Sequence, residues 1–451
     1  MRIVLEGGAV LICDAERRAL SEGSVVIEDG RIVSVGEALR QHLPSAERVD
    51  CRGCVVMPGL VNSHVHLGEQ LFKGLLEDVD FEGVFYSTLF AWEGRLTPQL
   101  VRRASLAAAV ESLRCGVTTI ADMYHHADAT AEAVQAVGIR AVLGQKVLGF
   151  SLGRPPVASA DGVDYRFDRG AFRDQLAAAC EFADRVNGSA SGRITTALCP
   201  HATNTLEPWM LERVAEEADR RSLRVHMHVA QMESERDDVA ARSGMGCVEI
   251  LDSTGLLTER LLAAHAIFVS EPEVKQLSAR RVGVAHNPVA NAKDGGLVAP
   301  VPLFRAQGVE IALGTDAFHM NLLETARFAV YLHRARAGDA RFVSPEDVLE
   351  WATLGGARAL GMSDEIGSLE PGKRADLLVV DLQALNLVPW HNPAAAVLYH
   401  ADPRNLRLVM VDGRVVVENG TVSTVDAAEV NREFASAADE VQRRIGVSGG
   451  R

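Results

Sequence analysis

The chain has 451 residues, of which 47% are hydrophobic and 24% charged, and its formal net charge is −14. This acidic balance, without a long basic run, argues against nucleic acid and anionic membrane surfaces as partners. No stretch approaches the ~18 consecutive apolar residues that a membrane helix needs, and the seven scattered cysteines suit reduced thiols in the cytoplasm.

Both ends of the chain contain short strand-like segments separated by tight turns. Near the N-terminus these segments are 3–5, 9–12, 24–27 and 31–35, and near the C-terminus they are 375–381, 406–411 and 414–417. Glu28-Asp29-Gly30 and Asp412-Gly413 are acidic-glycine pairs of the kind that favours hairpins. Since neither set alone makes a stable sheet, we expect one small β-sandwich built from residues 1–56 and 366–425. Residues 426–451 are expected to form a C-terminal helix and a frayed tail.

The middle of the chain, residues 57–365, alternates strand-like and helix-like segments. Besides the apolar run before His64, the strand-like segments are 117–121, 139–143, 194–198, 223–228, 262–265, 282–286 and 309–313. Eight strands interleaved with helices over about 300 residues predict an α/β fold of the (β/α)8 TIM-like barrel type. In such barrels the chemistry lies at the C-terminal ends of the strands. The glycine- and proline-rich segment 151–170 is a plausible active-site flap.

Two histidines one residue apart, His64 and His66, follow an apolar run and a Pro58-Gly59 break. Side chains alternate across a strand, so both imidazoles are expected on the same side. Such a pair at a strand end is half of a site for zinc or ferrous iron.

Three more metal-ligating side chains stand at the ends of predicted strands: His228, His265 and Asp316. Three or four histidines and one carboxylate bind a single divalent ion and leave one position for water. The ion lowers the pKa of that water towards ~7 and so creates a hydroxide nucleophile. Asp316, besides ligating the ion, can accept the proton of the attacking water.

Several short motifs, in this order, resemble the amidohydrolase superfamily. They are Pro58–His66, Gly116–Thr119, Cys199–His201, His226–His228, Ala264–His265, His286–Pro288, Gly314–Asp316 and Gly367–Leu377. The resemblance covers about residues 1–425 and is strongest to the cytosine deaminase and chlorohydrolase-like branch, which includes adenosine-derivative, guanine and s-triazine aminohydrolases. It implies a single Zn²⁺ or Fe²⁺ held by His64, His66, His228 and Asp316, and a homodimer. His265 would then orient the water or the substrate, and His201 would contact the substrate.

The proton shuttle departs from the pattern of that branch. Most such deaminases carry a glutamate three residues after the fifth-strand histidine, where this chain has Gln231, and a neutral amide cannot exchange a proton in that way. Glu233 and Glu235 are expected to be solvated charges at the start of a helix. Glu69, three residues after His66, is an alternative source of the acid or a substrate contact, since guanine-type relatives use a glutamine there to hold the base and adenosine-type relatives carry an apolar residue.

Three further residues are candidate substrate contacts at the mouth of the barrel. His286 precedes Asn287-Pro288 at a strand end, and His319 closely follows Asp316. Trp92 is interpreted as a packing residue first and a stacking surface for the substrate second.

These features predict a metal-dependent aminohydrolase that removes ammonia from an amino-substituted purine, pterin, pyrimidine or triazine. A second hypothesis keeps the hydroxide nucleophile but has it cleave a cyclic amide or displace halide or alkylamine, since such reactions could dispense with the missing glutamate. A third is a catalytically silent binding protein, against which the intact ligand set argues.

Overall fold

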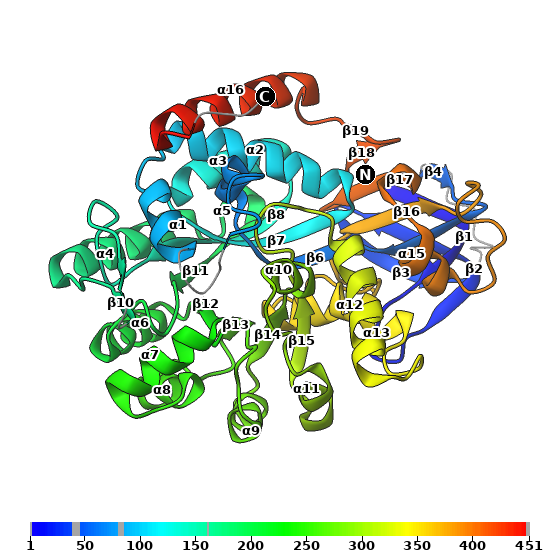
Figure 1. Cartoon of the computed structure of the whole chain (residues 1–451). Helices are drawn as coiled ribbons and strands as arrows, with labels where there is room; N and C mark the ends of the chain where they lie inside the picture. Colours follow the sequence, from blue (N-terminus) through cyan, green and yellow to red (C-terminus); the bar gives the residue numbers. More distant parts are fainter. Residues whose placement is uncertain (1, 38–45, 80–84, 160–161, 448–451) are drawn as a thin grey trace.

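The barrel occupies the centre of the computed structural model, which describes residues 2–37, 46–79, 85–159 and 162–447 (Figure 1). Its eight strands run in the order β15-β14-β13-β12-β11-β8-β7-β6, each parallel to its neighbour. They are β6 (Leu60–Val65), β7 (Val117–Tyr124), β8 (Arg140–Val147), β11 (Ile194–Pro200), β12 (Arg224–Val229), β13 (Leu261–His265), β14 (Gly283–His286) and β15 (Glu310–Leu313). A parallel bridge between Val65 and Asp316 joins the first strand to the last. The predicted (β/α)8 barrel is confirmed.

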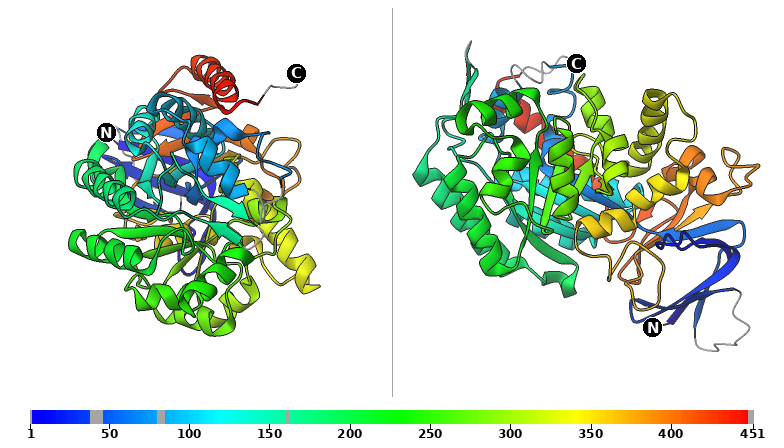
Figure 2. Two further views of the ribbon diagram at one scale, coloured as in Figure 1. Left: turned by 60° about the vertical axis from the view of Figure 1, so that its left-hand side comes forward. Right: turned by 90° about the horizontal axis from the view of Figure 1, so that it is seen from below.

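Helices follow the strands and cover the outside of the barrel (Figure 2). They are η1 (Leu67–Phe72), α1 (Tyr86–Glu93), α2 (Pro98–Arg114), α3 (Ala127–Val137), α4 (Arg169–Val186), the turn α5 (Ser189–Gly192), α6 (Pro208–Arg221), α7 (Glu233–Ser243), α8 (Cys247–Ser253), α9 (Glu271–Ala279), α10 (Pro288–Lys293), α11 (Val301–Gln307), α12 (Leu322–Ala337), α13 (Pro345–Trp351) and α14 (Leu354–Ala359). The first turn of helix α2 illustrates how the sequence determines where a helix begins. Thr97 caps it by accepting a hydrogen bond from the Leu100 N–H, and Pro98 occupies its first turn, where a missing N–H costs nothing.

Strands from both ends of the chain share a second, mixed sheet. Its nine strands follow the order β19-β18-β17-β16-β5-β1-β2-β3, with β4 beside β1. They are β1 (Arg2–Leu11), β2 (Ala19–Glu28), β3 (Arg31–Gly36), β4 (Glu47–Asp50), β5 (Cys54–Pro58), β16 (Leu377–Asp381), β17 (Leu406–Val411), β18 (Arg414–Glu418) and β19 (Thr421–Val422). The antiparallel pairing of β5 with β16 joins the two ends. Both termini therefore contribute to this part of the fold as expected, and the expected β-sandwich is present as one mixed sheet.

Both acidic-glycine pairs form the expected hairpins. Asp29 and Gly30 turn between β2 and β3, and Asp412 and Gly413 turn between β17 and β18, all with positive φ. Position 413 requires glycine, because a Cβ there would lie 2.5 Å from the Cα of Gly30. The two hairpins thus contact each other at their tips.

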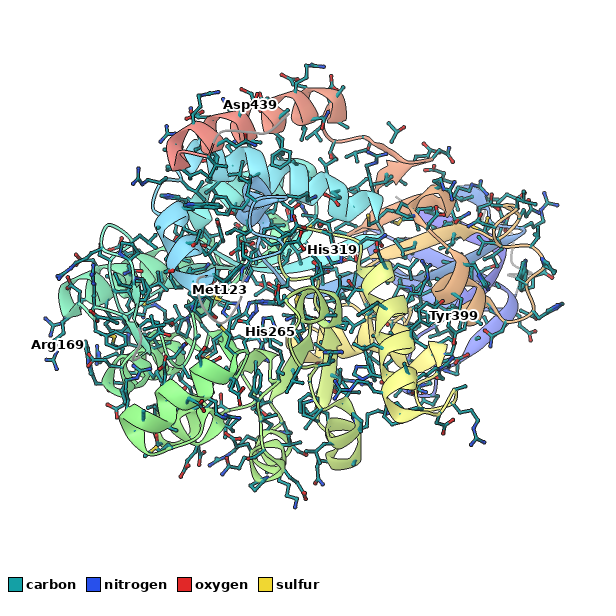
Figure 3. All side chains as sticks on the ribbon, viewed as in Figure 1. Met123, Arg169, His265, His319, Tyr399 and Asp439 are labelled. Carbon is teal, nitrogen blue, oxygen red and sulfur yellow. The ribbon has the colours of Figure 1, made fainter. Side chains whose placement is uncertain are left out.

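The remaining elements are α15 (Pro393–His400), the short η3 (Pro403–Asn405), the hairpin of β9 (Val157–Ser159) with β10 (Gly162–Asp164), and α16 (Ala427–Ile445). Helix α16 lies across α2 (Figure 1), where its Ala437 and Val441 are buried, while Asp439 of the same helix lies at the periphery of the molecule (Figure 3). The predicted C-terminal helix is present; the predicted tail, 448–451, and part of the predicted flap, 160–161, lie outside the described residues. Among the helices described, none has the length and apolar character needed to span a membrane.

Candidate active site

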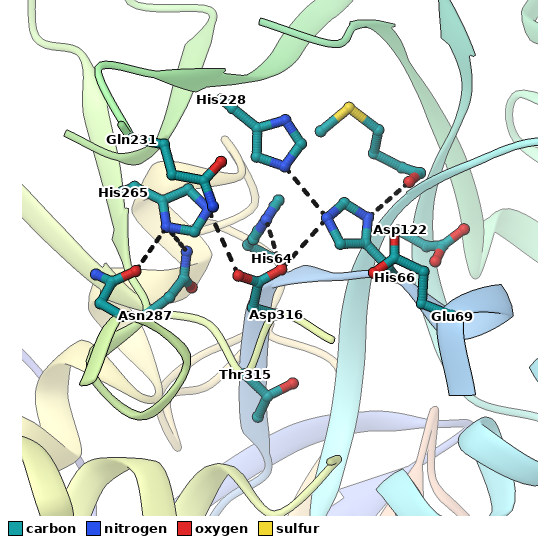
Figure 4. Close-up of polar contacts among 12 residues, drawn as sticks. His64, His66, Glu69, Asp122, His228, Gln231, His265, Asn287, Thr315 and Asp316 are labelled. Atoms are coloured by element: carbon teal, nitrogen blue, oxygen red, sulfur yellow. Dashed lines mark hydrogen bonds and ion pairs between the residues drawn. The ribbon is translucent and has the colours of Figure 1, made fainter. Parts of the chain in front are cut away.

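Side chains of the metal-ligating type converge at the C-terminal end of the barrel strands (Figure 4), in two overlapping groups: His64, His228 and His265, and His64, His66 and Asp316. His64 is the last residue but one of β6 and His66 lies just beyond the strand, His228 belongs to β12, and Asp316 follows β15. Nε2 of His66 lies 3.2 Å from Nε2 of His228 and 3.3 Å from Oδ1 of Asp316. Nε2 of His64 lies 3.5 Å from the same carboxylate oxygen. Residues far apart in the sequence therefore present three imidazoles and a carboxylate to one point.

The far nitrogen of each imidazole has a partner that fixes the ring. Nδ1 of His66 donates to the carbonyl oxygen of Met123 over 2.8 Å, and Nδ1 of His228 donates to the carbonyl oxygen of His201 over 2.7 Å. Because a carbonyl can only accept, both Nε2 atoms carry a lone pair towards the cluster. This arrangement, in which the outer nitrogen is held and the inner one is free, is typical of metal-binding histidines.

The residues fit a divalent cation. Nε2 of His64 is buried and has no hydrogen-bond partner among the described residues, a costly state unless a ligand occupies the lone pair. Burial and the neighbouring His64 lower the pKa of His66 to about 3. Burial opposes the ionisation of Asp316, yet its contact with His64 and the nearby imidazoles of His265 and His66 hold its pKa well below the usual range. Neutral imidazoles around an ionised carboxylate are the donor set of zinc and of ferrous iron.

His265, at the end of β13, is brought beside this cluster. Its Nε2 lies 3.6 Å from Oδ2 of Asp316, and its Nδ1 lies 2.9 Å from Oδ1 of Asn291. Donation from Nδ1 to that amide oxygen leaves Nε2 with its lone pair towards Asp316. His265 thus faces the carboxylate oxygen opposite to the one that contacts His64 and His66.

A cavity of about 220 Å³ opens onto the cluster. Its lining includes His66, His228 and Asp316 of the cluster together with Glu69, His201 and Gln231. His319 lines it as well, with its Nε2 3.1 Å from Oγ1 of Thr325, and Figure 3 places His265 and His319 near the centre of the molecule. The structure therefore gathers most of the candidate residues around one small-molecule cavity.

Two candidate substrate contacts lie elsewhere. Trp92 packs against Phe72, with ring centroids 5.7 Å apart, and His286 is fully buried with its Nε2 2.9 Å from Nε2 of His333. Neither belongs to the lining of this cavity. The packing interpretation of Trp92 matches its position.

Gln231 lines the cavity and is held at both ends. Its side-chain oxygen accepts a hydrogen bond of 3.2 Å from the Tyr86 hydroxyl, and its backbone N–H donates to Glu235 over 2.7 Å. Glu235 is fully buried and also accepts from the Thr203 hydroxyl. The expectation that Glu235 is a solvated charge is wrong. Glu235 lies in the first turn of α7, which packs against the loop that contains Gln231, and its carboxylate accepts hydrogen bonds from backbone N–H groups of that loop. Glu233, paired with Arg236, keeps an exposed side chain as expected.

Glu69 belongs to a buried row of charges along the cavity wall. Nζ of Lys146 lies 2.7 Å from Oε1 of Glu93 and 3.7 Å from Oε1 of Glu69. The other oxygen of Glu93 is 3.1 Å from Nε2 of His125. Burial raises the pKa of Glu69 well above its usual value, which Lys146 only partly opposes. Burial would lower the pKa of Lys146, but Glu93 and Glu69 raise it, so the ammonium stays charged.

Sequence reasoning missed three residues of this site: His226, Lys146 and Tyr86. His226 stands two residues before His228, the same spacing that marked His64 and His66, so a signal existed. Lys146 lies beyond the predicted strand 139–143, in the part of β8 that sequence reasoning did not include. Tyr86 carried no signal, because its position depends on how α1 packs over the barrel.

Comparisons with known proteins place these features in one family. The Amidohydrolase family matches residues 55–416. The chain is 34% identical to the 5'-deoxyadenosine deaminase of Methanosarcina acetivorans, covering 98% of this chain and 99% of the relative. It is 36% identical to the 5-methylthioadenosine/S-adenosylhomocysteine deaminase of Desulforudis audaxviator, over 94% and 95% of the two chains. An adenosine deaminase structure from Xanthomonas campestris with bound zinc superimposes with a TM-score of 0.89, at 30% identity and 98% coverage of each chain. The chain belongs to the amidohydrolase family, as a metal-dependent aminohydrolase that acts on an amino-substituted nitrogen heterocycle.

Proposed function

We propose that the substrate is an adenosine-type nucleoside, a 6-aminopurine that loses its amino group as ammonia. The observation that carries this proposal is the full-length similarity to the two deaminases of 5'-modified adenosines. The small cavity on the cluster suits one heterocycle at the metal end. Lys293, Asp294 and Phe318, which also line the cavity, would face the sugar.

In this proposal His64, His66, His228 and Asp316 hold one divalent ion. When bound, the ion would polarise a water molecule and lower its pKa. Oδ2 of Asp316, the oxygen next to His265, takes the proton of the attacking water. Nε2 of His265 orients that water, because Asn291 occupies the other nitrogen of its ring.

The remaining candidates position the heterocycle. His201 and His319 face the ring and the sugar from the cavity wall. The side-chain oxygen of Gln231 accepts a hydrogen bond from Tyr86, and its NH2 group donates to a ring nitrogen of the substrate. Glu69 accepts a hydrogen bond from the substrate. His286 and Trp92, which lie outside the lining, act through packing.

We also propose zinc as the resident metal, a homodimer as the working form, and the cytoplasm as the location. The zinc-bound adenosine deaminase structure supports zinc, although the same ligands accept ferrous iron. Metal analysis of the purified protein and light scattering test the first two, and fractionation of the source cells tests the third.

The test is ammonia release from a panel of adenosine, 5'-deoxyadenosine, 5'-methylthioadenosine and S-adenosylhomocysteine, with guanine, cytosine and an aminotriazine as comparison substrates. Product mass identifies deamination, since NH is exchanged for O. We expect turnover of at least one adenosine derivative well above the other classes. Zinc-loaded protein that acts on guanine or the triazine but on none of the adenosine derivatives would overturn the proposal.

A further inference from the structure

Lys146 is a buried cation with no role so far, and it reaches the cavity from the barrel wall. It belongs to β8, its side chain is 1% exposed, and it contributes to the cavity lining. Its ammonium group lies 4.9 Å from the centre of the Tyr124 ring. A charged group is rarely buried beside a ligand cavity unless its remaining hydrogen-bonding capacity is used.

Glu93 forms an ion pair with Lys146 on the side away from the cavity. It is 1% exposed, it is absent from the cavity lining, and its two oxygens are engaged by Lys146 and His125. One carboxylate therefore balances one ammonium outside the cavity. An ammonium has three N–H donors, so donor capacity is left over after the bond to Glu93.

Glu69 is the member of this buried row of charges that lacks a hydrogen-bonded counter-charge among the described residues. It lies in η1, one turn after His66, and it is 2% exposed. Its oxygen is 3.7 Å from Nζ of Lys146, which is beyond hydrogen-bond distance. Among the described residues, the ammonium group of Lys146 is the cation that lies within ion-pair distance of the Glu69 carboxylate. A buried acceptor and a buried donor thus stand side by side on the cavity wall, each short of a partner.

We propose that Lys146 and Glu69 together bind the amidine edge of the heterocycle, the N–C=N unit that carries the exocyclic amine. Glu69 accepts a hydrogen bond from the amino group, and Lys146 donates to the ring nitrogen beside the amino-bearing carbon. This inference rests on the proposed function and adds its mode of recognition. It places the amino-bearing carbon next to the metal cluster, because Glu69 and His66 belong to the same short segment of chain.

The edge of the substrate supplies both missing partners at the right spacing. An amidine presents a donor nitrogen and an acceptor nitrogen on either side of one carbon, which matches neighbouring carboxylate and ammonium groups. A ligand without the amino group leaves Glu69 unpaired, and a ligand without the ring nitrogen leaves Lys146 unpaired. Leaving a buried charged group unpaired costs more than an ordinary hydrogen bond contributes, so this wall would select amino-substituted azines over their analogues.

The experiment pairs variants with substrate analogues that lack single atoms. Lys146→Met should lower kcat/KM for the preferred adenosine derivative by roughly 10- to 100-fold, as expected for a lost charged hydrogen bond. With 1-deazaadenosine, which lacks the ring nitrogen beside the amino-bearing carbon, the factor, measured as the change in inhibition constant, should fall towards 1. 7-Deazaadenosine keeps that nitrogen and should show the full factor. Lys275→Met, at an exposed lysine paired with Glu271, is the matched control and should change none of these values.

A second, independent arm uses Glu69→Met and a substrate without an amino group. Glu69→Met should slow adenosine-type substrates and leave hydrolysis of 6-chloropurine riboside unchanged, since chloride offers no N–H to Glu69. Equal losses on every substrate in both arms would show that the row of charges is structural and would overturn the inference while the proposed function stands. Wild-type enzyme that turns over no adenosine derivative overturns both.

Discussion

Nδ1 of His64 lies 2.7 Å from Nε2 of His226. Both rings are buried, and burial together with the neighbouring His64 holds the pKa of His226 well below its usual value. A neutral His226 accepts from the Nδ1–H of His64, which turns the lone pair of Nε2 towards the metal cluster. For His66 and His228 a backbone carbonyl accepts the outer N–H instead. Among the three proposed histidine ligands, His64 is therefore the one whose orientation depends on another side chain.

His226→Phe should therefore weaken metal binding without removing a ligand. Loss of a residue that orients a metal-binding histidine typically costs about 10- to 100-fold in metal affinity. A competition titration with a chelator measures the affinity, and His391→Phe, at an exposed position, is the control. Unchanged affinity in His226→Phe would mean that His64 does not ligate the metal.

Gly314 packs tightly against residues of the active site. A Cβ there would lie 2.2 Å from Oδ1 of Asn287 and 2.8 Å from Cβ of His64. Gly314→Ala must displace one of them, and we expect a loss of about 1–3 kcal/mol in stability together with a marked loss of bound metal. Gly36→Ala, whose Cβ meets nothing within 4 Å, should be neutral. Metal content and thermal unfolding measure both, and full metal occupancy in Gly314→Ala would contradict this expectation.

Arg140 and Asp376 form a buried ion pair between the barrel and the second sheet. The guanidinium donates to both carboxylate oxygens, over 2.7 and 3.0 Å, and both side chains are 2% exposed. Arg140→Met leaves a buried carboxylate without its counter-charge, which costs about 3–5 kcal/mol. Arg185→Met, which breaks an exposed pair with Asp128, should cost about 0–1 kcal/mol. Urea unfolding compares the two, and similar losses would show that the junction does not depend on this pair.

The fold was predictable because the signals for it are periodic and local. Apolar runs of strand length recur between helix-like segments, and the alternation of side chains in a strand is enough to place His64 and His66 on one side. Strand ends in barrel order then brought His228, His265 and Asp316 to the same edge. The Asp29-Gly30 turn was equally local, since its residue types favour it.

The residues that sequence reasoning missed or misjudged depend on contacts between distant segments. Glu235 stands where a helix begins, a position that is usually solvated, and only the fold of the loop before it buries the carboxylate. The role of Lys146 depends on its ion pair with Glu93, which belongs to a helix that packs over the barrel mouth. Single-residue patterns carry no record of such pairs, so these roles required the structure.

His333 and His286 share a buried contact that should make stability depend on pH. Burial, reinforced by the nearby charge of Arg336, lowers the pKa of His333 to about 4 from an ordinary value of 6.5. The unfolded chain therefore takes up a proton as the pH falls through about 6.5, and the folded chain does so only near 4. The contribution of His333 to stability is present in full above pH 6.5 and is lost progressively between these values, by up to about 3 kcal/mol at ~1.36 kcal/mol per pKa unit.

His333→Gln removes this titration while keeping a hydrogen-bonding side chain opposite His286. We expect the free energy of unfolding to fall less in the variant than in the wild type between pH about 7.5 and about 4.5. Both proteins are measured in the presence of a chelator, because release of metal from the active-site histidines would otherwise add its own pH dependence. Since those histidines are identical in the two proteins, the difference between the two pH profiles isolates the contribution of His333. Identical profiles would show that His333 titrates at its ordinary value in the folded protein.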